Sequence, residues 1–392
     1  MNKGLSLWLD VLRVMATFVV VFSHFAYPRF SNGAFQWFRD LYLGSDALVI
    51  FFMVSGLVIA FAADRDAAAG EYAFNRLTRL WSVLIPALVL TFLLDSFGAR
   101  LDPNAYPEGF YAPVTLAEML GRGAIFTNEF SSLGRLRLGT NGPLWSLSYE
   151  AAYYAIFGVA VFSQGAKRVV LLLGLAYLIG VPILLLMPAW LMGVAAWYGL
   201  KSGRFEALSH PRALICAVGA PLAYTLLLWA DAPQILSQDS SAMLGGINLN
   251  ASFGFSDEFV WNGFLGLLTV THIIGMSRLT AHARADAKAI RWLAGGSFSL
   301  YVTHYPLLHF FDAALPDSAG RAALMLAGTL IAGLLFAAIF ERPIKGVRQI
   351  LRRAITAFNP PNAKAFDSTT STAASRATLG TTSSAHSGSG SS

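Results

Sequence analysis

The chain contains a series of apolar segments, most of which have about the length that an α-helix needs to cross a bilayer. Ten of them recur along its 392 residues, at about 7–27, 44–63, 80–97, 144–163, 169–187, 189–200, 213–230, 259–276, 293–313 and 322–340. A spanning helix needs ~20 mainly apolar residues, and its backbone polar groups must bond to one another because the bilayer core holds no water. We therefore expect an all-α polytopic membrane protein with about ten transmembrane helices.

The charged residues support this fold class and predict an orientation. Only 13% of the residues are charged, against ~25% in an average soluble domain. The net charge of +6 does not indicate nucleic acid as a partner, because the basic residues fall between apolar segments. If the N-terminus lies in the cytoplasm, 20 of the 28 Lys and Arg residues fall inside, seven fall outside and Arg13 lies within the membrane. Since cytoplasmic loops are enriched in Lys and Arg, we expect both termini to be cytoplasmic.

Two regions depart from a regular series of spans. Between 169 and 200, two helices must share a segment that contains Pro182 and Pro188, so we expect a boundary near Pro188 and one short or re-entrant helix. The end of the chain is rich in Ser, Thr, Gly and Ala and has little to bury. We expect a membrane-embedded domain at 1–350 and a disordered, Ser/Thr-rich cytoplasmic tail at 351–392.

The first apolar segment carries three ionisable residues, Asp10, Arg13 and His24. Such groups cost several kcal/mol in hydrocarbon unless they face a partner or water, so they suggest a functional site. Arg13 and His24 are eleven residues apart, which places them on one helical face with ~16 Å between them along the axis. Asp10 lies one turn before Arg13 and can neutralise it in part. A structural ion pair with a hydrogen-bonded histidine in a helical bundle would also explain this pattern.

Six sequence motifs resemble those of one membrane enzyme family. They are LDVLRVMATFVVVFSH at 9–24, FFMVSGLVIA at 51–60, NRLTRLW at 75–81, NGPLWSLSYEAAYY at 141–154, GSFSLYVTHYPLL at 296–308 and FERP at 340–343. In content and in order they are similar to the acyltransferase 3 family of integral membrane acyltransferases. Asp46 stands farther from FFMVSG than the acidic residue usual in that family, so we assign it no role.

The resemblance implies an O-acyltransferase of a bacterial-type inner (plasma) membrane. Such an enzyme moves an acyl group, usually acetyl, from cytoplasmic acyl-CoA to a hydroxyl of an extracytoplasmic carbohydrate such as a cell-surface polysaccharide. We expect acetyl-CoA as the donor, lipid as the surroundings and no metal. A secondary transporter or flippase for a glycan or small molecule is the alternative, because many helices with intramembrane charge also suit a substrate pathway. The resemblance leaves three questions open: whether transfer is direct or passes through an acyl-enzyme, whether a soluble extracytoplasmic partner takes part, and which oligomeric state the protein has.

The resemblance also gives roles to particular residues. A sugar hydroxyl is a poor nucleophile, and neutral His24 would act as the general base that removes its proton. Arg13 would bind the donor or stabilise negative charge on it. Glu150 would accept a hydrogen bond from the other ring nitrogen of His24 and orient the ring. Otherwise, Glu150 is an acid stabilised at a helix N-terminus.

Two further arginines are expected to bind the donor at the cytoplasmic border. Arg76 and Arg79 are three residues apart, so both guanidinium groups can contact the phosphates of acyl-CoA. The orientation rule alone would also place arginines there. Four other residues are expected close to the catalytic residues: Asp10, Trp145, Ser148 and His304.

Overall fold

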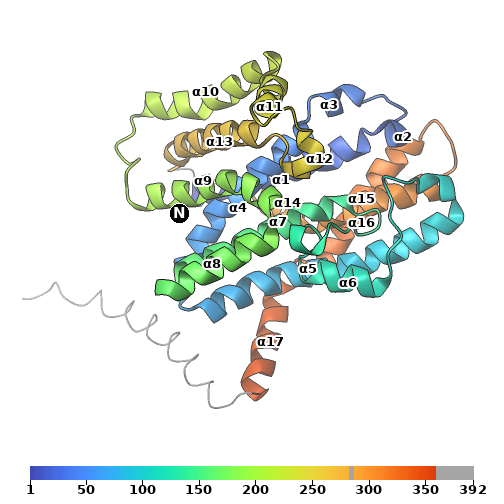
Figure 1. Cartoon of the computed structure of the whole chain (residues 1–392), viewed down its shortest axis with the longest axis horizontal. Coiled ribbons are helices and arrows are strands. Elements are labelled where there is room, and N and C mark those ends of the chain that lie inside the picture. The colour runs from blue at the N-terminus through green and yellow to red at the C-terminus, as the bar shows by residue number, and fades with distance from the viewer. Residues whose placement is uncertain (282–286, 359–392) are drawn as a thin grey trace, which may run out of the picture. The chain divides into compact units, whose positions relative to one another are not determined.

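The computed structural model describes residues 1–281 and 287–358 of the chain, and in this part it contains helices and no β-strand (Figure 1). The chain divides into two compact units, Met1–Pro343 and a second unit that begins at Ile344. The all-α expectation is confirmed for the described residues.

Seventeen α-helices and four short 3₁₀ helices make up the described part. In chain order they are α1 (Lys3–Phe25), α2 (Pro28–Ser31), α3 (Gln36–Asp40), α4 (Leu43–Ala63), α5 (Ala69–Leu101), η1 (Pro103–Ala105), α6 (Leu116–Ala124), η2 (Ser131–Leu133), η3 (Gly142–Leu144), α7 (Trp145–Phe162), α8 (Gly165–Ile179), α9 (Val181–Lys201), α10 (His210–Trp229), α11 (Ala232–Met243), α12 (Leu249–Phe253), η4 (Gly254–Ser256), α13 (Phe259–Leu279), α14 (Lys288–Ala294), α15 (Ser297–Ala314), α16 (Arg321–Phe340) and α17 (Ile344–Phe358).

The ten expected apolar segments are largely helical, although 169–187 and 293–313 are each divided between two helices, and fewer of them qualify as membrane spans. Seven helical segments of the described part are long and apolar enough to cross a membrane, namely α1, α4, α5, α9, α10 and the segments that contain α13 and α16. The helices α7, α8 and α15 are outside this group. The chain is thus an integral, multi-pass membrane protein, and the count of ten spans stays a prediction.

The boundary expected at Pro188 is wrong. The break lies at Gly180, whose φ of 85° is in the left-handed region that favours glycine. Pro182 then occupies the first turn of α9, where a missing N–H costs nothing. Pro188 lies inside α9, which continues for 21 residues from Val181 to Lys201.

The expected domain end at residue 350 stays a prediction, but the first part of the expected tail is helical. The second unit begins at Ile344, and α17 extends to Phe358, so residues 351–358 are helical rather than part of a disordered tail. In α17 the apolar residues Ile350, Leu351 and Ile355 alternate with basic residues at helical spacing, which makes the helix amphipathic. The rest of the expected tail lies outside the described residues.

Helix α4 is the core of the first unit. About two thirds of its most apolar stretch is buried, more than in any other candidate span. It packs against α1, α7, α9 and α13. Close approach to α9 depends on glycines, because a Cβ on Gly56 would overlap the carbonyl oxygen of Trp190 and one on Gly193 would overlap that of Met53. Small residues allow the same close approach in membrane helix pairs generally.

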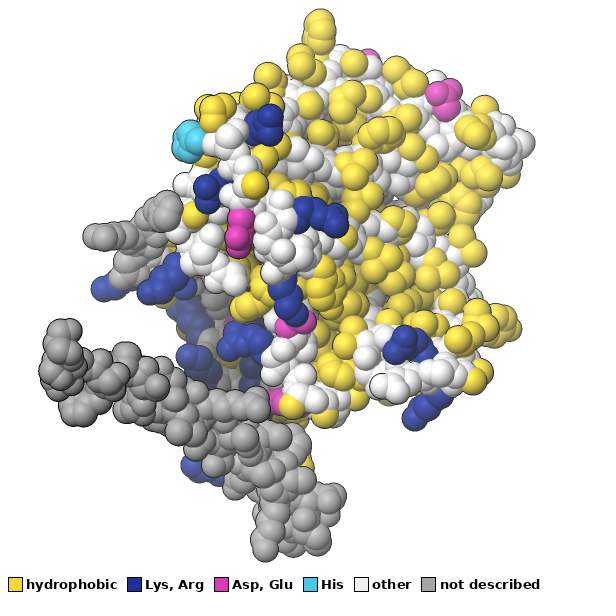
Figure 2. Space-filling model, turned by 90° about the vertical axis from the view of Figure 1, so that its left-hand side faces the viewer, with side chains coloured by type: hydrophobic (Ala, Val, Ile, Leu, Met, Phe, Trp, Pro, Cys, Tyr) yellow, Lys and Arg dark blue, Asp and Glu magenta, His cyan; other side chains and the backbone are white. Residues whose placement is uncertain are grey.

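The outward surface of the bundle is apolar, as a bilayer requires. In α16, Leu324, Ile331, Leu335 and Ile339 recur at helical spacing and are each about 60% exposed. Figure 2 shows hydrophobic side chains covering the right-hand part of the molecule in that view, whereas Lys and Arg side chains gather on the part toward its left. This separation fits a lipid-facing flank next to a polar, positively charged surface.

Candidate active site

His24 and Arg13 lie on one continuous helix, as expected. The helix α1 begins at Lys3, where the Asn2 side chain accepts a hydrogen bond from the Leu5 backbone N–H at 2.7 Å, and it ends at Phe25. Eleven residues of unbroken helix therefore separate the two side chains, which is ~16 Å of rise. Arg13 lies in the middle of α1, and His24 lies in its last turn.

His24 pairs with His304, although the two residues are 280 positions apart in the chain. The Nδ1 atom of His24 lies 3.0 Å from Nε2 of His304, and Nδ1 of His304 lies 2.6 Å from the carbonyl oxygen of Tyr301. A carbonyl oxygen can only accept, so Nδ1 of His304 carries the proton and its Nε2 accepts. Nδ1 of His24 then donates to His304, which leaves the lone pair of His24 on Nε2.

The position of His304 is fixed by contacts between α15 and the start of α7. The Tyr301 hydroxyl donates to the carbonyl of Pro143 at 2.8 Å and lies 2.6 Å from the Ser146 hydroxyl. One residue further along α15, the Val302 carbonyl accepts from the Asn141 side chain at 2.8 Å. These contacts pack the motifs at 141–154 and 296–308 against each other.

Glu150 does not contact His24, so the expected hydrogen bond between them is replaced by the His24–His304 pair. Instead, one carboxylate oxygen of Glu150 accepts from the Ser55 hydroxyl at 2.6 Å and from the Tyr154 hydroxyl at 2.5 Å. Glu150 lies in the second turn of α7, which agrees with the expected position at a helix start. Position along a helix was inferred correctly, but the side of the helix was not.

Arg13 is the centre of a second cluster of charged residues. Its guanidinium lies 3.9 Å from the Asp10 carboxylate, the expected neighbour. It is also within electrostatic range of Arg79, Glu341 and Glu150. Glu341, from the FERP motif, accepts a hydrogen bond from the Ser299 backbone N–H at 2.8 Å. Charged residues of the third, fourth and last motifs therefore act electrostatically on Arg13 of the first motif.

Arg76 and Arg79, which were expected to bind the donor together, have different neighbours. Arg76 forms an ion pair with Asp66 at 3.2 Å, and Asp66 also accepts from Asn75. Arg79 forms no ion pair with a described residue, and its charge acts on Arg13. The charge of Arg291 in α14 acts on Asp10. The joint role of Arg76 and Arg79 stays a prediction.

Trp145 and Ser148 lie near the start of α7, away from the histidine pair. The Ser148 hydroxyl donates to the Asn128 side chain at 2.6 Å, and the Trp145 ring stacks on Phe255 with 4.2 Å between centroids. Both contacts join α7 to neighbouring loops. The structure therefore gives them positioning contacts, without contact to His24.

Two residues have contacts that the sequence analysis did not predict. Arg39 of α3 lies over the Tyr27 ring, 3.4 Å from its centroid, and its charge acts on His24. Asp46 is buried in α4 and accepts from Tyr224 at 2.7 Å and Trp261 at 2.8 Å. Arg39 lies in a short polar segment that has no periodicity. Asp46 bonds to residues that are remote in sequence.

No group of three or more His, Cys, Asp or Glu residues in the described part of the chain is placed to hold a metal ion.

Comparisons with known proteins agree with the resemblance of the motifs. The family model described as "Acyltransferase domain", that of acyltransferase 3, matches residues 6–342. The chain is similar to the "O-acetyl transferase" of Shigella phage Sf6, with 27% identity over 213 residues that cover 50% of this chain and 62% of the phage protein. It is also similar to "Peptidoglycan O-acetyltransferase OatA" of Listeria monocytogenes serovar 1/2a, with 24% identity over 371 residues that cover 86% of this chain and 55% of the relative. The chain thus spans less than two thirds of the length of either relative. No solved structure matches the chain significantly.

Proposed function

The chain belongs to the acyltransferase 3 family, and we propose that it transfers an acetyl group from cytoplasmic acetyl-CoA to a hydroxyl of an extracytoplasmic carbohydrate. The family and the names of the two relatives support O-acetyl transfer at a membrane. The donor, the acceptor, the inner membrane and the cytoplasmic termini belong to this proposal.

The observation that carries the proposal is the hydrogen-bonded pair of His24 and His304. A general base for a sugar hydroxyl needs an accessible lone pair near neutral pH and a fixed ring orientation. Two hydrogen bonds in series, from Nδ1 of His304 to the Tyr301 carbonyl and from Nδ1 of His24 to Nε2 of His304, fix the orientation of the His24 ring. They leave Nε2 of His24 as the base. His304 thus takes the orienting role that the sequence analysis gave to Glu150.

The reaction then runs as follows. Nε2 of His24 removes the proton of the acceptor hydroxyl while the oxygen attacks the carbonyl carbon of the thioester. The tetrahedral intermediate collapses, the C–S bond breaks and the new C–O bond remains as the ester. The imidazolium returns the proton to the departing CoA sulfur. Positive charge from Arg39, which acts on His24, favours the negative oxygen of the intermediate.

The cluster around Arg13 is the proposed donor site. CoA carries several phosphate charges, and guanidinium groups are the side chains best suited to bind them. Arg79 and Arg291 lie toward the end of the bundle where α1 begins, and Arg13 lies between them and His24 along α1. The ~16 Å from Arg13 to His24 matches the reach required of an extended pantetheine arm. Glu150 and Glu341 act as counter-charges to Arg13 in this arrangement.

Purified protein in proteoliposomes tests the proposal directly. Acetyl-CoA supplied on one side and carbohydrate on the other should give CoA release together with an acetylated carbohydrate, measured by thiol reagent and mass spectrometry. Carbohydrate that crosses the membrane without CoA release would favour the transporter alternative instead.

Two matched variants test the donor site. Arg79→Ala should weaken acetyl-CoA binding by ~10-fold or more, because a charged hydrogen bond to phosphate contributes ~1.5–3 kcal/mol. Arg76→Ala should leave the affinity nearly unchanged, since Asp66 already pairs with that guanidinium. Equal affinity in both variants and in the parent would refute the donor site.

A further inference from the structure

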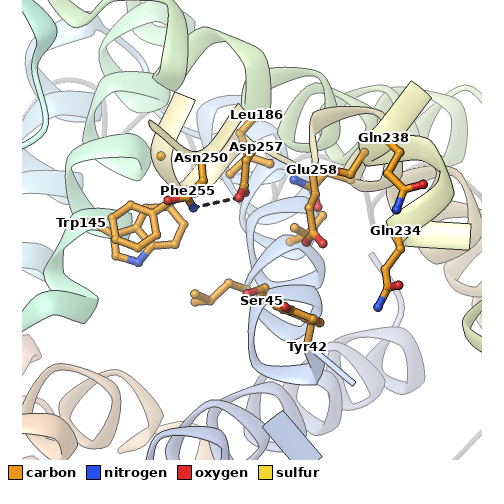
Figure 3. Close-up of a pocket in the computed structure, with 15 residues that line it drawn as sticks. Tyr42, Ser45, Trp145, Leu186, Gln234, Gln238, Asn250, Phe255, Asp257 and Glu258 are labelled. Carbon is orange, nitrogen blue, oxygen red and sulfur yellow. Dashed lines mark hydrogen bonds between the residues drawn. The ribbon is translucent and has the colours of Figure 1, made fainter. Parts of the chain in front are cut away.

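A polar cavity of about 420 Å³ lies at the end of the bundle where α1 ends and α4 and α7 begin (Figure 3). Its walls come from the first turns of α4, the start of α7, the segment of α11, α12 and η4, and the start of α13. Its volume is within the range of ~300–1,000 Å³ that is typical of small-ligand sites. Nothing in the catalytic arrangement described above uses this cavity.

An aromatic platform forms one wall. Phe255 and Trp145 stack face to face, with an interplanar angle of 5°, and Phe255 is 48% exposed. Tyr149 forms a T-shaped contact with Trp145, with 4.9 Å between the ring centroids. An exposed, rigid aromatic face next to polar groups suits the apolar C–H face of a sugar ring better than it suits a freely hydrated ion.

The opposite wall carries unused hydrogen-bonding groups. Gln234 and Gln238 of α11 and Glu258 before α13 line the cavity across from Trp145 and Phe255 (Figure 3), and their side chains form no hydrogen bond with a described residue. Asn250 donates to Asp257 at 2.9 Å and keeps its amide oxygen available. Amide and carboxylate groups can both accept hydroxyl protons, and the amides can also donate.

The composition of the cavity favours one class of ligand. None of its 15 lining residues is Lys, Arg or His, although the Arg135 guanidinium lies against the lining residue Gly254. Asp257 and Glu258 contribute two carboxyl groups, and amide and hydroxyl side chains supply the other polar groups. A neutral ligand with many hydroxyls fits the aromatic pair, the amides and the carboxyl groups.

A short chain of contacts links the cavity to the histidine pair. Trp145 is followed by Ser146, which bonds to Tyr301, and the Tyr301 carbonyl holds His304 against His24. A second contact involves Gly44, which lies between Tyr42 and Ser45, two residues that line the cavity. A Cβ on Gly44 would overlap the side chain of Ser23, the residue before His24. The start of α4 and the start of α7 therefore contribute both to the lining of the cavity and to the contacts around the histidine pair.

From this geometry we propose that the cavity binds the acceptor, and that the acceptor segment bound here is a neutral, hydroxyl-rich glycan. The inference rests on the proposed function, because it assigns the carbohydrate of that reaction to this cavity. Donor and acceptor then enter from opposite ends of α1: the phosphates at the arginine cluster and the glycan at the carboxylate-lined cavity.

Binding and transfer measured on the same variants test the inference. The probes are three neutral trisaccharides (maltotriose, mannotriose and chitotriose), with tri-galacturonate as the anionic counterpart. We expect the full-length protein in detergent to bind at least one neutral probe by saturation-transfer NMR and to bind tri-galacturonate at least tenfold more weakly. Phe255→Ala should weaken binding of the neutral probe by ~10-fold or more, while Phe255→Trp, which keeps the platform, should restore it.

A control variant and a second measurement distinguish glycan binding in the cavity from the proposed acetyl transfer. Phe264→Ala removes an equally exposed ring of α13 that does not line the cavity, and it should change neither binding nor transfer. The affinity for acetyl-CoA in each variant reports whether the fold is intact. Failure to bind any neutral probe, or equal binding by Phe255→Ala, would overturn the inference even if acetyl transfer proceeds. Binding that depends on Phe255 without any CoA release would uphold the cavity and refute the proposed function.

Discussion

At the scale of single residues, the account depends on which nitrogen of His24 carries the proton. His304 decides this, because its own Nδ1 faces a carbonyl oxygen at 2.6 Å and its Nε2 must then accept from His24. The lone pair that is left on Nε2 of His24 is the proposed base. Positioning partners of this kind typically contribute ~10–100-fold to activity.

Removal of His304 should lower kcat for transfer by ~10–100-fold without changing the affinity for acetyl-CoA. His304→Leu removes the acceptor for Nδ1 of His24, whereas His304→Gln retains an amide oxygen that can accept and should restore part of the rate. His272→Gln is the control, because His272 bonds to Trp8 and the Ala217 carbonyl in another part of the bundle. If His304→Leu and His304→Gln lose equal activity, in proportion to the loss of folded protein, His304 has a structural role only.

A pH effect is expected from Glu129, which lies in the loop before α7. Burial raises the pKa of its carboxyl from 4.5 to about 7, although Arg135 lies 3.4 Å away and lowers it. The folded state therefore holds this proton more tightly than the unfolded state does. The protonated carboxyl of Glu129 therefore contributes its full stabilisation below pH 4.5, and this stabilisation is lost as the pH rises toward 7.

Glu129→Gln should remove this loss, because the amide stays neutral. The variant and the parent should melt at similar temperatures at pH 5. At pH 8 the free energy of unfolding of the variant should exceed that of the parent by at most about 3 kcal/mol. Thermal unfolding in detergent at both pH values measures the difference. A variant that loses stability equally at both pH values would show that the carboxylate is needed in its charged form.

At the scale of elements, the active-site geometry depends on the close packing of α4 against α9. Glycines make this possible, since Gly56 and Gly193 each lie against a carbonyl oxygen of the other helix. Ser55, next to Gly56, donates to Glu150, so a shift of α4 would also move the counter-charge of Arg13.

Gly56→Ala should therefore reduce both the amount of folded protein and its activity, because the added methyl group overlaps the Trp190 backbone. Gly174→Ala in α8 adds the same methyl group where no atom lies within 4 Å, and it should be neutral or stabilising by up to ~1 kcal/mol. Size-exclusion recovery and melting temperature check both variants. Normal melting of Gly56→Ala would contradict the tight α4–α9 contact.

At the scale of the whole molecule, the arrangement is polarised along α1. The arginine cluster lies toward its start, and the histidine pair and the neutral-glycan cavity lie toward its end. The distribution of basic residues predicts that the first end is cytoplasmic.

Cysteine labelling tests this orientation. In a Cys216→Ser background, cysteine at the exposed Ser132 of η2 should react with an impermeant reagent from outside intact cells. Cysteine at Ser202, just after α9, should react only after permeabilisation. The opposite pattern would reverse the proposed orientation of donor and acceptor.

The sequence predicted what depends on local periodicity and length. The all-helical, multi-pass architecture and the continuous helix that carries Arg13 and His24 follow from apolar runs and a 3.6-residue repeat. The pairing of His24 with His304 did not follow, because it depends on how α1 packs against α15. Gly180 was missed as a helix boundary because its role comes from backbone conformation, and Pro188 was the stronger local signal.

The same limit explains the errors at the charged residues. Glu150 was expected to bond to His24, but its carboxylate accepts from Ser55 of α4 and from Tyr154, one turn later in α7. Arg76 and Arg79 share a spacing that suits joint binding, yet Asp66 pairs with only one of them.

The most direct test of the account is the rate of acetyl transfer by His24→Ala, measured at equal amounts of folded protein and at saturating acetyl-CoA and acceptor. If His24 is the general base, transfer should fall by ~10²–10⁴-fold while the affinity for acetyl-CoA stays that of the parent. Transfer by His24→Ala at the rate of the parent would contradict the mechanism.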